Sequence, residues 1–325
     1  MQSIRQNYLN QGVAPATAEI MLRAQRPSTH RQYQSYISLW LDHCRMRNID
    51  ALQPPVPKVL DFMEELREAR KLGYNALNIV RSALSSIIVL PDGTPFGQTR
   101  LTKIYMKGVF NTKPPVPRYV DTWDPATVLR FLKKWNPPSK LTLKQLTFKV
   151  AMLIVLVTGQ RIQTLVLLHV NCMSVNRDSV VFRIFDLLKQ SRPGYRNPEI
   201  VLKAYPTDKT LCIFTFLLAY IRRTKPLREN TTALFLTLNK PHSAASKDTV
   251  SRWVKATMSA AGIDTSRFAP HSVRCASTSA AHRGGAPVNE IMQKAGWSSD
   301  NVFAKFYNKP LHTVTFQNAV LEIKD

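Results

Sequence analysis

Apolar side chains in the first 112 residues recur every three or four positions, which is the spacing of one face of a helix. One such face carries Tyr33, Ile37 and Trp40, and Ser28 or Thr29 precedes it as a candidate helix cap. Further helices are predicted over residues 57–72, 74–90 and 102–110. The pattern therefore predicts a compact, all-helical N-terminal domain.

In the second part of the chain the apolar pattern changes its period. Asp124 can cap a helix that extends to Trp135, and the run VAMLIVLV at 150–157 indicates a buried helix. Residues 179–188 and 199–205 are instead typical of two strands, with a Pro-Gly turn between them. Helices are then predicted over residues 209–223, 248–261 and 272–283. The fold class that follows is mainly α, with a small antiparallel β-sheet in a mostly helical second domain.

The boundary between the two patterns falls in NTKPPVPRYVD, at residues 111–121. Its three prolines, Pro114, Pro115 and Pro117, disfavour both helix and sheet. We therefore expect a helical domain at 1–112, a proline-rich linker at 113–121, and a second domain at 122–325 whose tail begins at about residue 310.

The net charge of the chain indicates what kind of partner it binds. The 325-residue chain has 45 Lys and Arg against 21 Asp and Glu, a net charge of +24, and the excess is spread along both halves. A broad basic surface favours a large polyanion, because many phosphates can be neutralised together. Hydrophobic residues make up 44% of the chain, which fits a folded protein rather than a disordered basic one. Nucleic acid is therefore favoured as the partner, and a merely basic protein is the alternative.

Cysteine usage and apolar run lengths exclude several other classes. Cys44, Cys172, Cys212 and Cys275 lie far apart without a CxxC pair, which disfavours a disulfide framework or a zinc site and favours the cytosol or nucleus. The apolar runs are too short to span a bilayer, and the N-terminus lacks the apolar core of a signal peptide. We therefore expect no membrane association.

Two arginines lie where an anion would be favourable. Arg161 follows the apolar run 150–157, so its guanidinium needs a phosphate or carboxylate unless it extends past Gly159 into water. His271 and Arg274, in HSVR, open a predicted helix and share one face near its N-terminal donors. Exposed surface side chains are the alternative for both.

The C-terminal segment FAKFYNKP, at 303–310, holds three aromatic residues. Phe303, Phe306 and Tyr307 have helical spacing, so a core stripe is the plain interpretation of the tyrosine. Trp297 lies ten residues earlier, after a small turn, and offers one N–H donor on a large apolar body.

The order of Arg161, Lys189, His271, Arg274, Trp297 and Tyr307 resembles that of the tyrosine recombinase, or phage integrase, family. The stretches TGQRIQTL, FAPHSVRCASTSAA and AGWSSDNVFAKFYNKP resemble its first-arginine, HxxR and terminal boxes, with tryptophan where many members have histidine. The sequences of these motifs are most similar to those of recombinases from DIRS-type and Ngaro-type eukaryotic retroelements. RPSTHRQYQSYISLWLDHC, near the N-terminus, also resembles their core-binding (SAM-like) domain.

The resemblance implies an enzyme that cleaves and rejoins DNA strands, as a site-specific recombinase or integrase. Tyr307 would attack a phosphodiester and form a 3′-phosphotyrosyl bond, while Arg161 and Arg274 hold the non-bridging oxygens. The covalent bond conserves the phosphodiester energy, so neither ATP, a metal ion nor another cofactor is expected. A type IB topoisomerase-like nicking-closing enzyme and a catalytically silent DNA-binding derivative are the alternatives.

The resemblance also gives roles to the remaining candidates. His271 would act as general acid or base, Trp297 would donate its indole N–H to the phosphate, and Lys189 would protonate the leaving 5′-oxygen. A solvated hairpin lysine is the alternative for Lys189. Further DNA contacts are expected from exposed basic residues, namely Arg31, Arg81, Lys103, Lys107 and Arg192.

Two features depart from the family pattern. Thr164 stands three residues after Arg161, where an acidic residue is common, so the support of Arg161 must come from elsewhere. The interval from Trp297 to Tyr307 is one residue longer than the commonest spacing, which a short loop can absorb. The resemblance further implies a homotetramer on double-stranded DNA, and residence in the nucleus or otherwise the cytoplasm. The tail from about residue 310 would dock on a neighbouring subunit, and the alternative is that it covers its own domain.

Overall fold

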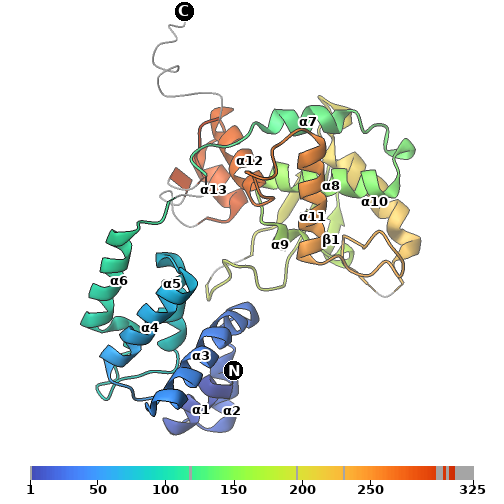
Figure 1. Cartoon of the computed structure of the whole chain (residues 1–325). Helices are drawn as coiled ribbons and strands as arrows, with labels where there is room; N and C mark the ends of the chain where they lie inside the picture. The colour runs from blue at the N-terminus through green and yellow to red at the C-terminus, as the bar shows by residue number, and fades with distance from the viewer. Residues whose placement is uncertain are drawn as a thin grey trace, which may run out of the picture. The chain divides into compact units, whose positions relative to one another are not determined.

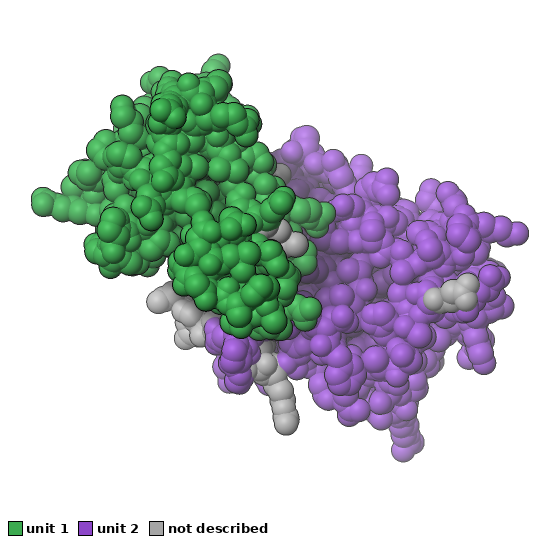
Figure 2. Space-filling view, turned by 90° about the horizontal axis from the view of Figure 1, so that it is seen from below, with its two compact units in different colours: residues 1–118 green, residues 119–325 purple. Residues whose placement is uncertain are grey.

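The computed structural model describes residues 2–116, 119–194, 197–229, 231–297, 303–304 and 307–311. They form mostly helices and one small antiparallel sheet, which confirms the predicted mainly α fold. The chain divides into two compact units, residues 1–118 and residues 119–325, which Figure 2 colours separately. The predicted tail from residue 312 onwards, Pro117 and Phe306 lie outside the described residues.

The described part of unit 1 is helical (Figure 1). Its helices are α1 (Gln2–Asn10), α2 (Pro15–Leu22), α3 (Pro27–Arg47), α4 (Val56–Arg70), α5 (Tyr74–Leu84), the 3-10 turn η1 (Phe96–Gln98) and α6 (Arg100–Thr112). Trp40 of α3, Met63 of α4 and Leu77 of α5 are fully buried in one core. The Trp40 indole donates to the carbonyl of Ala51, so even the polar edge of this core residue is satisfied.

Two local predictions for unit 1 are wrong. The helix α3 begins at Pro27, whose fixed φ suits the first helical position, so Ser28 and Thr29 lie inside the helix and cap nothing. The helix α5 ends at Leu84 rather than at residue 90. The Ser85 hydroxyl donates to the Arg81 carbonyl 2.6 Å away, and the chain then leaves the helix.

Unit 2 contains the remaining elements. In chain order they are α7 (Pro125–Lys133), η2 (Pro138–Lys140), α8 (Leu143–Thr158), α9 (Ile162–Leu165), η3 (Val170–Cys172), β1 (Met173–Val175), β2 (Ser179–Phe182), β3 (Ile200–Lys203), η4 (Lys209–Leu211), α10 (Ile213–Thr224), η5 (Lys225–Leu227), α11 (Lys247–Ala260), α12 (Ser272–Arg283) and α13 (Val288–Ala295). Asp124 caps α7 as predicted, because its carboxylate accepts from the Ala126 amide 3.0 Å away.

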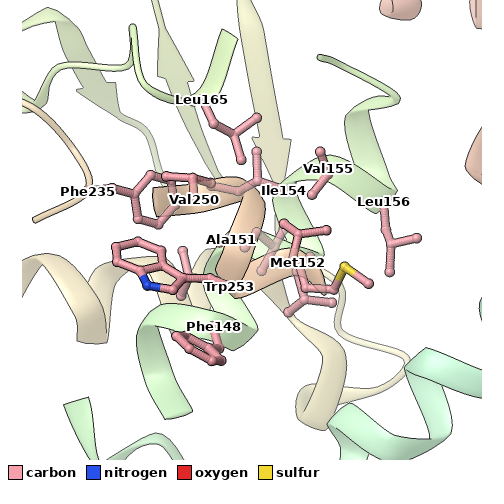
Figure 3. Packing of buried hydrophobic residues seen from close by; sticks show 14 of the residues in the cluster. Phe148, Ala151, Met152, Ile154, Val155, Leu156, Leu165, Phe235, Val250 and Trp253 are labelled. Carbon is pink, nitrogen blue, oxygen red and sulfur yellow. The ribbon is translucent and has the colours of Figure 1, made fainter. Parts of the chain in front are cut away.

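The helix α8 is the centre of unit 2. It is buried on nearly every side, and α10, α11 and α12 pack around it. Figure 3 shows Phe148 and Ile154 of α8 beside Val250 and Trp253 of α11. Residues 150–156 are therefore part of the core, whereas Val157 is exposed. None of the described helices is both long and apolar enough to cross a membrane.

The sheet is antiparallel in the order β1-β2-β3, with Val180 of β2 opposite Leu202 of β3. Both predicted strands are real but shorter than expected, and β1 was not predicted. The strand β2 stops early because the side chain of Asn197 binds the backbone that follows it. The amide of Asn197 donates to the carbonyls of Ile184 and Asp186, at 3.0 and 2.8 Å, in place of ladder partners.

Candidate functional site

A tight turn connects the buried C-terminal end of α8 to Arg161. Gly159 ends the helix in the left-handed conformation, with φ of 59°, and a Cβ there would lie 3.1 Å from Thr278 of α12. Arg161 then takes the N-cap position of α9 and is partly buried. One of its guanidinium nitrogens donates to the side-chain oxygen of Gln190, 3.0 Å away. The arginine therefore turns into the protein rather than out to water.

Arg274 is a buried cation that joins the ends of two helices. Its side chain is 1% exposed, and its two terminal nitrogens donate to the carbonyls of Gly159 and Ala295, both at 2.7 Å. Burial, together with repulsion from Arg161, lowers the pKa of Arg274 to about 10, although Tyr307 opposes this shift. The side chain still carries its charge at neutral pH.

Trp297 and Tyr307 lie on this cation. The guanidinium carbon of Arg274 is 4.3 Å from the centre of the Trp297 ring and 5.3 Å from that of the Tyr307 ring. The two ring centroids are 4.3 Å apart and tilted by 36°. Three residues that are distant in the sequence therefore form one cluster, beside Arg161.

Backbone contacts hold Tyr307 against α12. The hydroxyl of Ser279 donates to the Tyr307 carbonyl and accepts from the amide of Lys309, and the sulfur of Cys275 lies 3.6 Å from the same carbonyl. The Tyr307 amide donates to the carbonyl of Phe303, 2.9 Å away. Phe303 is buried against Trp297, so the core interpretation holds for it. The Tyr307 side chain itself is only half-buried.

Three buried donors of the site have no hydrogen-bond partner among the described residues. They are the Trp297 indole nitrogen, the Arg274 Nε and the Gln190 amide nitrogen. Folded proteins rarely leave buried polar atoms unpaired, and such sites need an explanation. All three groups can only donate, so a ligand rich in lone pairs, such as a phosphate group, would satisfy them.

His271 and Lys189 are close in the sequence to Arg274 and Gln190, respectively, and both are exposed. His271 is the N-cap residue of α12, three positions before Arg274. Lys189 lies in the turn just before Gln190, the residue that contacts Arg161. The structure therefore brings together Arg161, Arg274, Trp297 and Tyr307, and leaves His271 and Lys189 at positions open to solvent.

The other predicted basic residues lie on separate elements. Arg31 on α3, Lys103 and Lys107 on α6, and Arg192 after the Gln190 turn are exposed, whereas Arg81 on α5 is partly buried. Lys103 and Lys107 are four positions apart and share one face of α6. These residues are accessible for a partner, apart from Arg81.

Sequence reasoning missed the residues that support the cluster. Gln190, Cys275 and Ser279 carry no motif of their own, and their roles come from contacts across more than 25 positions of the chain. Within the described residues, no group of three or more His, Cys, Asp or Glu side chains is placed to hold a metal ion.

Residues 124–313, more than half of the chain, match the model of the phage integrase family. One similar solved structure is the XerH site-specific recombinase bound to its palindromic difH substrate in a post-cleavage complex. The two sequences are 14% identical, the match covers 80% of this chain and 70% of that chain, and the TM-score is 0.54. The lambda integrase tetramer bound to a Holliday junction has 16% identity, coverage of 91% and 77%, and a TM-score of 0.52.

A third similar structure is the Tn1549 transposon integrase in complex with transposon right end DNA. It has 16% identity, coverage of 98% of both chains and a TM-score of 0.56. At these identities the likeness shows a shared fold. A search of curated proteins finds no match to the sequence.

Proposed function

The chain belongs to the phage integrase family of tyrosine recombinases, and we propose that it cleaves and rejoins DNA strands with Tyr307 as the nucleophile. The proposal rests above all on the stacking of Tyr307 and Trp297 over the buried Arg274 guanidinium, beside Arg161. Four residues from three distant parts of the chain meet there, and they supply a nucleophile, two cations and a neutral donor.

The first step is attack by the Tyr307 hydroxyl oxygen on the phosphorus of a DNA phosphodiester. The new bond joins that oxygen to phosphorus, and the bond from phosphorus to the 5′-oxygen breaks. The tyrosine proton leaves toward His271, and Lys189 delivers a proton to the departing 5′-oxygen. The product is a 3′-phosphotyrosyl enzyme and a free 5′-hydroxyl.

The second step reverses the first with a different strand. A 5′-hydroxyl from the partner DNA attacks the phosphotyrosyl phosphorus, and the bond to Tyr307 breaks. One phosphodiester replaces another, so the exchange consumes no ATP. Independence from metal ions is part of the proposal, because Arg161 and Arg274 supply the positive charge that the reacting phosphate needs.

The arginines and the tryptophan stabilise the charge that builds on the non-bridging oxygens. A phosphate in this position would lie near the Arg274 Nε and the Trp297 indole nitrogen, two buried donors without partners among the described residues. Arg274 is held before substrate arrives by the carbonyls of Gly159 and Ala295, and Trp297 packs against its guanidinium and against Phe303. Preorganised donors of this kind need no reorganisation during the reaction.

Unit 1 is proposed to bind DNA as a core-binding domain, joined to the catalytic unit by the linker 113–121. Exposed Arg31, Lys103 and Lys107 and the net charge of +24 support this role, since a broad positive surface suits the phosphate backbone. Arg81 and Arg192 complete the proposed set of contacts. The lambda integrase of similar fold forms a tetramer on a Holliday junction, and a homotetramer is proposed here too.

The biological setting is also part of the proposal. The motif sequences resemble those of recombinases from DIRS-type and Ngaro-type eukaryotic retroelements. This resemblance favours a role in the integration of a mobile element and residence in the nucleus. The similar Tn1549 integrase is named for a transposon, which supports a mobile-element role in general.

The test begins with a pool of nicked DNA duplexes whose core sequence is randomised. Wild-type chain is incubated with the pool, denatured, and separated to recover DNA that is covalently attached. Recovered sequences are then placed on two duplexes to measure strand exchange, and on a supercoiled plasmid to measure relaxation. Exchange supports the recombinase, relaxation alone favours the topoisomerase-like enzyme, and the absence of any adduct across the pool rejects catalysis.

A further inference from the structure

The side chain that holds Arg161 is a neutral amide from a distant loop. The Arg161 guanidinium donates to the oxygen of Gln190 at 3.0 Å, across 29 positions of the chain. The threonine at position 164, where an acidic residue is common in the family, is committed elsewhere. Its hydroxyl donates to the Gln160 side chain at 3.2 Å, and Gln160 in turn donates to the Lys294 carbonyl.

Gln190 is presented by a braced turn. The amide of Ser191 donates to the carbonyl of Leu188 at 3.0 Å, which makes Lys189 and Gln190 the two central residues of a β-turn. The Leu188 amide donates to the Ser191 hydroxyl, and that hydroxyl donates to Asn197 at 2.6 Å. Leu188 is 1% exposed, so its side chain anchors the turn in the core of unit 2. The position of Gln190 is therefore fixed by the fold.

The chemistry of the pair sets the orientation of the amide. A guanidinium has only donors, so the Gln190 oxygen must face Arg161 and the nitrogen must face away. That nitrogen is buried and has no partner among the described residues. A donor left in this state next to Arg161 suits a phosphate oxygen.

We propose that Gln190 is the positioning residue for Arg161, in place of the acidic side chain that the chain lacks at position 164. The neutral amide holds the guanidinium without neutralising it, so the full charge of Arg161 stays available to a phosphate. The same braced turn carries Lys189, so the side chain that holds Arg161 and the proposed general acid come from adjacent residues. This role rests on the proposed function for its catalytic consequence, but the contact itself exists in the free protein.

The first measurement needs no DNA. The protein is labelled with 15N-arginine, and the exchange of its guanidinium N–H protons with water is followed by NMR. The protons of a hydrogen-bonded guanidinium exchange slowly. We expect Gln190→Ala to speed the exchange at Arg161 at least fivefold, and Gln190→Glu to restore slow exchange because it keeps an acceptor. Arg274 is the internal control, since Gly159 and Ala295 hold it independently.

The second measurement is the rate of covalent adduct formation on a duplex recovered with wild-type chain. Gln190→Ala should slow this rate roughly 10- to 100-fold, the scale expected for a misplaced reacting group. The matched control is Gln163→Ala, which removes an exposed glutamine from α9, two residues from Arg161. It should stay within twofold of wild type, and thermal denaturation should show that both variants are folded.

The two measurements separate the possible failures. Unchanged Arg161 exchange in Gln190→Ala overturns the positioning role, whether or not the chain cleaves DNA. An adduct rate within twofold of wild type overturns it as well. If wild-type chain forms no adduct while Arg161 exchange responds as expected, the proposed function fails and the contact stands.

Discussion

Among its described residues, unit 2 buries the cations Lys149 and Arg274, and they differ in how completely the protein satisfies their hydrogen-bond donors. Lys149, in the middle of α8, is 0% exposed, and its ammonium donates to the carbonyls of Leu132, Trp135 and Thr210 at 2.6–2.9 Å. An ammonium has three donors, so all are used. The Phe216 ring lies 3.7 Å from the same nitrogen. The Lys149 ammonium therefore has no donor left for a ligand.

Arg274 is buried to the same extent but keeps binding capacity. Backbone carbonyls take two of its five N–H groups, and its Nε has no partner among the described residues. Its aromatic neighbours are Trp297 and Tyr307, of which Tyr307 is half-buried. A cation whose donors are all used stabilises the fold, and one with unused donors is prepared for an anion.

The largest effect is expected at Arg274. Arg274→Lys keeps the positive charge but loses the forked geometry, so it cannot hold Gly159, Ala295 and a phosphate together. We expect the rate of adduct formation to fall about 100- to 1,000-fold, the scale for removing a donor from an anion site. Single-turnover kinetics on a nicked duplex measure this. A loss below fivefold would mean that Arg274 is structural, like Lys149.

The complementary change is Lys149→Met, which removes the satisfied cation. Three buried carbonyls lose their partner, and we expect the free energy of unfolding to fall by about 2–4 kcal/mol. Adduct formation by the folded variant should be unaffected. Urea unfolding measures the stability, with Lys144→Met, at an exposed position of the same helix, as the control within about 0.5 kcal/mol. Equal losses in both variants would contradict the assignment.

The protonation of Lys149 should make the free energy of unfolding depend on pH. Burial lowers the pKa of Lys149 to about 8, well below its ordinary value, so the folded state loses this proton before the unfolded state does. Between pH 8 and about 10.4 the unfolded chain binds more protons, so stability relative to Lys149→Met should rise with pH. Urea unfolding of both chains at pH 7, 8, 9 and 10 measures the difference. A falling difference would show that Lys149 holds its proton more tightly when folded.

The smallest effect is expected from the support of Tyr307. Ser279→Ala removes the hydroxyl that bridges the Tyr307 carbonyl and the Lys309 amide, so the tyrosine segment should loosen on α12. We expect adduct formation to slow about tenfold at a cost of about 1 kcal/mol in stability. Ser277→Ala is the control, because its hydroxyl bonds to Leu156 of α8 instead. Similar kinetic losses in both would point to a general effect on α12.

The sequence was enough to predict much of this arrangement. The order of Arg161, Lys189, His271, Arg274, Trp297 and Tyr307 predicted one site, and the structure brings together four of them, without His271 and Lys189. The helix at 272–283 and the cap Asp124 lie where expected. The carbonyl partners of Arg274 could not be predicted, because backbone acceptors 115 and 21 positions away have no residue preference. Gln190 was missed because an amide in a loop carries no pattern. The end of β2 was missed because the Asn197 amide binds the carbonyls of Ile184 and Asp186.

The identity of the nucleophile is the central claim, and it can be tested on the linked protein itself. Wild-type chain is trapped on a nicked duplex, the DNA is trimmed to a short stub, and the modified peptide is sequenced by mass spectrometry. We expect the 3′-phosphate of the stub on the oxygen of Tyr307, and no adduct from Tyr307→Phe. A stub attached to any other residue, or an undiminished adduct from Tyr307→Phe, would contradict the account.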